Sequence, residues 1–218
     1  MPNLIHNVIT VTGPPASVAA FQKKAASLAD RGANIFSFEA FLPMPKELDV
    51  ERSSDTQMAD LVYNGGDITE ILTYAWVKYA GVADRAGLID LFDMRYGSPG
   101  GMREVAAILQ ENRVKYGVKD WREWRGKYWG TSHDVMDAEV ALALDSTVQY
   151  RFDTAWTVAS AALVAISAQH PELVLACEFR HERGEYQFTI TWKGGECMCM
   201  TSHEPAAASV LPVISPDN

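Results

Sequence analysis

The chain has 218 residues, of which 48% are hydrophobic and 22% charged, and its 28 acidic and 19 basic residues give a net charge of −9. This composition is ordinary for a globular protein of one large or two small domains, and the acidic excess argues against a nucleic-acid partner, because phosphate neutralisation supplies most of such a protein's affinity. No apolar run approaches the roughly 20 residues of a membrane helix, and the first residues lack a signal-peptide pattern, so we expect a cytoplasmic protein without membrane contact.

The first 45 residues predict a β-α-β unit. Hydrophobic side chains alternate between Ile5 and Val11, as they do in a half-buried strand. Over residues 16–31 apolar side chains recur at steps of three and four, which predicts a helix with one buried face, and Gly32 suits its C-terminal end. A second strand is predicted over residues 35–42, because the prolines that follow cannot donate to a β-ladder.

Residues 46–146 predict a mostly helical insertion. The polar, acidic segment 49–60 has no clear period and is interpreted as a loop. Asp67 resembles the cap of an amphipathic helix over residues 68–79. A second helix is predicted over residues 98–116 and a third from Asp120 onward, where tryptophans recur at helical spacing.

The far end of the chain predicts β-α-β-β. Alternation over residues 147–153 indicates a strand, and an apolar face over residues 157–169 indicates a helix. Two further strands are predicted over residues 173–179 and 186–193, joined by the short polar hairpin 181–185.

Together these elements predict one α+β domain over residues 1–218. Its core is a ferredoxin-like antiparallel sheet of split β-α-β type, formed by residues 1–45 and 147–200, with helices on one face. The helical insertion 46–146 separates the two halves, and residues 205–218 are expected to be a frayed tail.

Several motifs resemble a known family. They lie at residues 1–3, 7–13, 41–45, 116–125, 129–131 and 152–156, in both halves and in the third insertion helix. With these motifs the chain resembles the uncharacterised phage and plasmid proteins that carry a YubB-like, ferredoxin-like C-terminal domain. The resemblance implies that the gene comes from a mobile element and implies no particular activity.

One surface is a candidate binding site, where the two most specific motifs are expected to meet. Tryptophans supply large amphipathic contact areas, and glycine allows close backbone approach. The alternative is a structural role, in which buried tryptophans and one aspartate cap hold a loop against the sheet. The candidate residues are Trp129, Gly130, Thr131, His133, Asp134, Asp153 and Trp156.

Catalysis at this surface is a weaker hypothesis. His133 with Asp134 or Asp153 is a legitimate acid–base pair, because a carboxylate can orient an imidazole. No serine or cysteine lies in a recognisable nucleophile motif. We therefore name no catalytic residue and no cofactor, and the balance is against an enzyme.

A zinc site near the C-terminus is also weighed and not adopted. Cys197, Cys199 and His203 offer thiolate and imidazole ligands, but a closed site needs a fourth, for which Cys177 is the candidate. Ordinary thiols are the more common case. An odd, low cysteine count also fits a reducing compartment.

Nucleic-acid binding has one local signal. Basic residues alternate with aromatic ones around the third insertion helix, as in some single-strand binders. A surface helix with solvated charges produces the same pattern, and the motif typical of RNA-binding ferredoxin-like sheets is absent. The residues concerned are Lys119, Trp121, Arg122, Trp124, Arg125 and Lys127.

The sequence thus favours a non-enzymatic accessory protein of a phage or plasmid that binds a host protein, for example as a counter-defence inhibitor of a CRISPR or restriction complex. An acidic face would then mimic nucleic-acid phosphates. The first alternative is a small enzyme or ligand-binding domain that uses residues 129–134 and 153–156, and the second is an RNA-binding or single-stranded-DNA-binding protein. The identity of the partner, the oligomeric state and the functional face stay open.

Overall fold

The computed structural model describes residues 3–29, 35–97 and 101–203. The chain divides into two compact units. The sheet unit comprises Met1–Pro43 with Lys127–Asn218, and the helical unit comprises Met44–Gly126.

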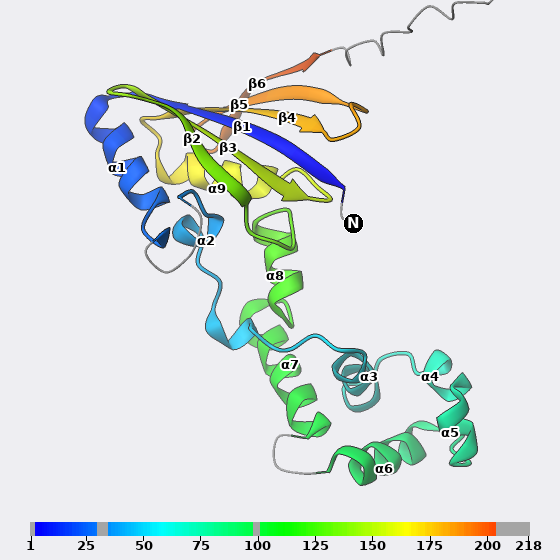
Figure 1. The fold of residues 1–218 in the computed structure, drawn as a ribbon. Coiled ribbons are helices and arrows are strands. Elements are labelled where there is room, and N and C mark those ends of the chain that lie inside the picture. The colour runs from blue at the N-terminus through cyan, green and yellow to red at the C-terminus, as the bar shows by residue number, and fades with distance from the viewer. Residues whose placement is uncertain (1–2, 30–34, 98–100, 204–218) are drawn as a thin grey trace, which may run out of the picture. The chain divides into compact units, whose positions relative to one another are not determined.

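The described part of the sheet unit contains a six-stranded sheet in the order β2-β3-β1-β4-β5-β6, in which every neighbouring pair is antiparallel (Figure 1). The predicted mixed α+β class and antiparallel sheet are therefore confirmed. The strands are β1 (Leu4–Thr12), β2 (Met136–Leu144), β3 (Thr147–Ala155), β4 (Val174–His181), β5 (Gln187–Lys193) and β6 (Glu196–His203).

Helices α1 (Pro15–Ala25), α2 (Phe38–Phe41) and α9 (Ser160–Gln169) lie on one face of this sheet (Figure 1). The core lies between them and the sheet, because strand side chains alternate between the two faces. In β1 the odd-numbered residues are buried, and Ile9 lies opposite Tyr150 of β3 and Cys177 of β4, which are buried too. The other face of the sheet carries no helix among the described residues of this unit and is referred to as the open face.

The strand predicted over residues 35–42 is wrong, because Phe38–Phe41 form the short helix α2. Phe36, Phe38 and Phe41 are all buried and pack as one aromatic cluster. In a strand, Phe41 would point to the face opposite to that of Phe36 and Phe38. The predicted helical insertion, residues 46–146, is also too long, because β2 at Met136–Leu144 belongs to the sheet and pairs with β3.

Strands β2 and β6 were not expected, and both form edges of the sheet. Every residue of β6 is exposed, and every residue of β2 is exposed or half-buried. In β2 the side chains of Met136, Val140, Leu142 and Leu144 share one parity, opposite to Asp137 and Glu139, so its sequence does carry a strand signal, whereas the apolar run of β6 has no such alternation. Helix α1 ends at Ala25, earlier than expected, while Gly32 and the tail 205–218 lie outside the described residues.

The described part of the helical unit consists of helices that pack around one apolar cluster. Its elements are η2 (Lys46–Leu48), α3 (Ser54–Tyr63), α4 (Thr69–Thr73), α5 (Ala75–Tyr79), α6 (Arg85–Tyr96) and α7 (Met102–Tyr116), and α8 (Trp121–Tyr128) crosses the boundary of the unit. The buried cluster consists of Ala59, Val62, Ile71, Val77, Leu88, Phe92 and Ala106.

The loop predicted over residues 49–60 is only partly right, because α3 begins at Ser54. Ser53 and Thr56 form a reciprocal capping box, which the scarcity of apolar residues had concealed. The helix predicted over residues 68–79 is broken at Tyr74, whose backbone is extended. Helix α6 was not predicted, whereas the helix at 98–116 is confirmed as α7 with a later start.

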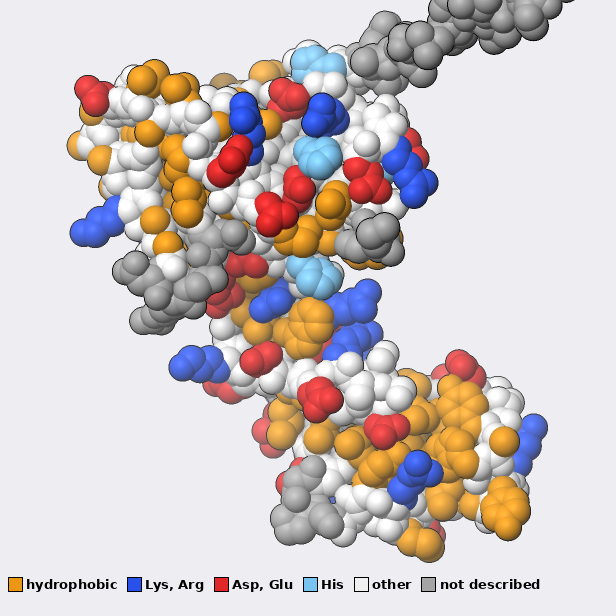
Figure 2. Space-filling view, in the orientation of Figure 1, with side chains coloured by type: hydrophobic (Ala, Val, Ile, Leu, Met, Phe, Trp, Pro, Cys, Tyr) orange, Lys and Arg blue, Asp and Glu red, His pale blue; other side chains and the backbone are white. Residues whose placement is uncertain are grey.

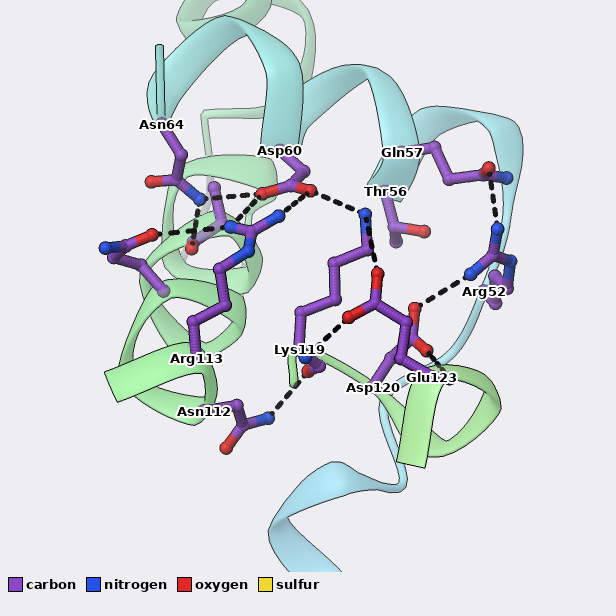
Figure 3. A network of polar contacts seen from close by, with 12 residues as sticks. Arg52, Thr56, Gln57, Asp60, Asn64, Asn112, Arg113, Lys119, Asp120 and Glu123 are labelled. Atoms are coloured by element: carbon purple, nitrogen blue, oxygen red, sulfur yellow. Dashed lines mark hydrogen bonds and ion pairs between the residues drawn. The ribbon is translucent and has the colours of Figure 1, made fainter. Parts of the chain in front are cut away.

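A buried ion network joins α3 to α7 (Figure 3). The Asp60 carboxylate, whose side chain is 3% exposed, accepts hydrogen bonds from two nitrogens of Arg113 at 2.7 and 2.6 Å. It also accepts from Lys119 Nζ at 2.8 Å and Asn64 Nδ2 at 2.9 Å. Burial alone would raise the pKa of Asp60, but the hydrogen bonds from these cationic and amide groups outweigh it and lower the pKa well below that of an ordinary aspartate.

Candidate functional site

The motif 129–131 has structural contacts. Trp129 is fully buried, packs against Phe38 and donates from Nε1 to the carbonyl oxygen of Leu42 at 3.1 Å. Gly130 has φ +80°, a left-handed conformation that side chains rarely adopt. Thr131 is buried and donates from Oγ1 to the carbonyl oxygen of Ala155 at 3.3 Å. These contacts fit the structural alternative, in which the loop is fastened to the unit.

Asp134 is the aspartate that caps a helix here, although the sequence had not singled it out for this role. Its carboxylate accepts hydrogen bonds from Ser37 Oγ at 2.5 Å and from the backbone N–H of Phe38 at 2.8 Å, at the start of α2. His133 is exposed and lies 3.0 Å from Ser132 Oγ through Nδ1. The structure therefore gives Asp134 a capping role beside the exposed His133.

The remaining candidates lie apart from the buried tryptophan. Phe152 packs near Phe38 on the helix-covered face, where Trp129 also packs, so its neighbour Asp153 points to the open face. Trp156 has φ +70° and is 56% exposed. Trp129 and Asp153 therefore lie on opposite sides of the sheet, and the seven residues do not form one surface.

The histidine that meets Asp153 is His6, a residue absent from the sequence-based candidates. His6 Nδ1 lies 2.8 Å from Asp153 Oδ1, and its side chain is 39% exposed. The register places His6 directly between Asp153 on β3 and Arg180 on β4. The alternation of residues in β1 predicts that His6 lies on the polar face of the strand. Its neighbours Asp153 and Arg180 follow only from the register of the three strands.

These three residues line a pocket of about 250 Å³ on the open face. Its other charged lining residues are Asp137, Glu139 and Arg151. Figure 2 shows acidic, basic and histidine side chains lying side by side on the sheet unit. The pocket is therefore polar and charged, with both signs present.

The open face carries no phenylalanine, tyrosine or tryptophan at the positions of the central strands β1, β3 and β4. Ferredoxin-like sheets that bind RNA stack bases on aromatic rings at such positions. The basic group around α8 is partly engaged as well, because Lys119 bonds Asp60 and the Arg125 guanidinium lies over the ring of Trp121 at 5.4 Å. These positions offer little support for the nucleic-acid alternative.

The helical unit presents a second candidate, built on aromatic rings around the buried Phe92. The rings of Tyr63, Trp76 and Tyr96 lie 6.2, 5.9 and 5.5 Å from the Phe92 ring, and all three side chains are half-buried. Figure 2 shows hydrophobic side chains gathered over α4, α5 and α6, with basic side chains beside them. The packing around Phe92 holds the three rings in place.

Two arginines cover these rings. The Arg95 guanidinium lies 5.1 Å from the Trp76 ring centroid and 5.4 Å from that of Tyr96. Arg103 lies 5.0 Å from the Tyr63 ring. The aromatic–arginine surface is defined here as Tyr63, Trp76, Arg95, Tyr96 and Arg103.

The two arginines differ in their charge partners. Arg103 forms a bidentate pair with Asp93, which also accepts from the Tyr63 hydroxyl at 2.8 Å. Burial, together with this hydrogen bond and the Asp93 charge, raises the pKa of Tyr63 to about 12. Arg95 makes no ion pair with any described residue. One of the two stacked cations is thus available to a partner.

Three further findings concern the cysteines, groups of metal ligands and membrane-spanning helices. Cys177 is buried, where burial raises the pKa of its thiol, and Cys197 and Cys199 are exposed free thiols on β6. Within the described ranges no group of three or more His, Cys, Asp and Glu side chains lies together in a way that would hold a metal ion. None of the described helices combines the length and apolar character that crossing a membrane requires.

The chain was compared with known proteins. It matches no protein-family model and no curated protein. Among solved structures it is similar to the crystal structure of protein api92 from Yersinia pseudotuberculosis, of the family DUF1281, with a TM-score of 0.47 and 8% identity over 93% of this chain and 98% of that one.

Proposed function

We propose that this chain is a non-enzymatic protein-binding module and that its aromatic–arginine surface contacts the partner. One observation carries the proposal: two arginines are stacked on three half-buried aromatic rings that a buried phenylalanine holds in position. Tryptophan, tyrosine and arginine are the residues that dominate binding energy at protein interfaces. Held rings also lose little side-chain entropy on binding, so more of the contact energy appears as affinity.

The charges of this surface indicate the chemistry of the partner. Asp93 already neutralises Arg103, so that side of the surface needs mainly apolar cover. Arg95 keeps guanidinium donors for a carboxylate, and the faces of Trp76 and Tyr96 favour apolar side chains next to it. We therefore expect a partner segment in which an acidic residue lies among apolar ones.

The biological role proposed for this binding follows the resemblance in the motifs. A mobile-element accessory protein that binds a host protein, for instance as a counter-defence inhibitor in the cytoplasm, would use such a surface. The net charge of −9 is compatible with mimicry of nucleic-acid phosphates. In that case binding would weaken steeply as salt is added, whereas binding dominated by the aromatic rings would not.

A ferredoxin-like ancestry of the sheet unit forms part of the same proposal. The strand order β2-β3-β1-β4, with α1 after β1 and α9 after β3, supports a split β-α-β pattern in which β2 replaces the segment predicted at residues 35–42. Strands β5 and β6 would then be an extension at one edge.

The test is affinity capture from host lysate followed by mass spectrometry, with nuclease present throughout. Arg95→Ala and Trp76→Ala should each lose the captured partner, because each removes half of a stacked pair. Lys115→Ala is the matched control, since Lys115 also lies over an aromatic ring, that of Tyr116 at 4.8 Å, outside the aromatic–arginine surface. Equal capture by all three variants would refute this surface as the binding face.

A further inference from the structure

A second site lies on the open face of the sheet unit, independent of the aromatic–arginine surface. Its floor is a cross-strand row in which Asp153, His6 and Arg180 are directly opposite one another on β3, β1 and β4. The Cβ atoms of neighbouring residues in such a row are about 5 Å apart, so the side chains can contact the same ligand. The next row along places Arg151 opposite Glu139 of β2.

Arg180 is the cation of this pocket that lacks a counter-ion. Among the described residues no carboxylate forms an ion pair with it. Glu178, two residues earlier on the same face, accepts instead from Gln187 Nε2 at 2.8 Å. The other arginine, Arg151, has Glu139 at 3.5 Å. The planar fork of Arg180 is therefore free to take a carboxylate in two parallel hydrogen bonds.

The neighbouring His6 is held in a defined orientation. Its Nδ1 lies 2.8 Å from Asp153 Oδ1, and no other described residue makes a polar contact with the ring. A carboxylate on Nδ1 places the proton of the neutral imidazole on Nδ1, so in the neutral ring Nε2 is left to accept a hydrogen bond from a ligand. The row thus offers two donors from Arg180 beside one acceptor from His6.

The remaining acidic residue limits the ligand. Asp137 lines the same pocket next to a β-bulge and has φ +51°, a left-handed conformation that is costly for a side chain other than glycine. Bulges re-aim side chains toward sites at sheet edges. Its negative charge disfavours polyanions, and a volume of about 250 Å³ suits only a small molecule.

From these observations we infer that the open-face pocket binds a small molecule with a single carboxylate, which pairs with Arg180, and with a donor group that reaches His6 Nε2. Nucleic acid and other polyanions are poor ligands for it, because Asp137, Glu139 and Asp153 surround the pocket. This site does not depend on the protein-binding proposal, since it lies in the other unit.

The test is an NMR titration of the full chain with glycine, acetate and benzoate, followed on the backbone amides of β1 and β4. We expect saturable shifts centred on His6 and Arg180 for at least one probe, and weaker shifts with inorganic phosphate. Arg180→Gln should weaken binding about tenfold, because one charge-assisted pair is lost. His6→Gln should weaken it less for acetate than for glycine, because only glycine brings a donor.

The control is Lys193→Gln, which removes a cation from the same open face outside the pocket. It should leave the dissociation constant within about twofold, because an exposed charge at a distance is screened. Shifts that grow linearly without saturation for every probe, or that are the same in Arg180→Gln and in the unchanged chain, would overturn the inference. Stronger binding of phosphate than of every carboxylate probe would also overturn it.

Discussion

Replacing Asp60 by asparagine should lower the free energy of unfolding of the helical unit, because the change removes the charge at the centre of the network that joins α3 to α7. The substitution keeps the size of the side chain, so cavity formation contributes little. It leaves Arg113 without its carboxylate and leaves Lys119 only Glu123 at 3.8 Å, and the two cationic side chains are only 35% and 17% exposed. Removing one partner of a buried ion pair costs about 3–5 kcal/mol. Because Arg113 regains some water, we expect about 3 kcal/mol.

The assay is urea denaturation monitored by hydrogen–deuterium exchange. Exchange is measured in peptides from α3 and α7, so the readout reports on the helical unit alone. The control is Glu47→Gln, which breaks the exposed pair of Glu47 with Lys115 in the same unit, where solvent screening leaves little to lose. If Asp60→Asn and Glu47→Gln shift the midpoint equally, the network contributes no more than a surface ion pair, and the reasoning fails.

The lowered pKa of Asp60 gives the same prediction a pH signature. A carboxylate whose folded pKa is depressed contributes stability that is fully present above the unfolded pKa, near 4, and is lost as pH falls through the lower folded value. The unchanged chain should therefore lose stability between about pH 5 and pH 2 more steeply than Asp60→Asn. Parallel pH profiles of the two proteins would contradict this assignment of the charge.

Substitutions at three further positions test the packing of Trp129 and Gly130 and the N-cap of α3. Trp129→Ala should lower the free energy of unfolding, measured by urea denaturation, by about 3–5 kcal/mol, because it empties a fully buried site. Trp129→Phe should recover most of this free energy while losing the hydrogen bond to Leu42. An alanine variant as stable as the unchanged chain would return Trp129 to the binding candidates. Gly130→Ala should cost more than about 1 kcal/mol, because φ is +80° and the added Cβ would lie 3.3 Å from a carbonyl oxygen; an unchanged melting temperature would show that the loop relaxes. Ser53→Ala should cost about 0.5–2 kcal/mol by removing the N-cap of α3, with faster amide exchange in its first turn as the readout, while uniform exchange along the helix would argue against the capping box with Thr56.

The interior of the sheet unit was predictable because its strands are half-buried. Strands β1, β3 and β4 and helices α1 and α9 each bury one face, and a buried face requires apolar residues at a regular spacing in the sequence. The structural role of the motif 129–134 was also among the alternatives, because a buried tryptophan and a capping aspartate are common anchors.

The helical unit was less predictable because its helices are short. Tyr74 interrupts one apolar stripe, and α3 is mostly polar, so periodicity over a long window fails there. The capping box at Ser53 was a local signal that could have located the start of α3.

The sequence by itself determined the α+β class and the central strands, since burial repeats every second residue wherever a strand has a core on one side. Only the tertiary structure decided the edges and the sites. The exposed strand β6 buries too little to carry a pattern, and the pairing of His6 with Asp153, 147 residues apart, follows from the register. Likewise Arg113 meets Asp60 across 53 residues, because two helices pack together. Contacts between side chains far apart in the sequence leave no local period, so they are fixed only when the chain folds.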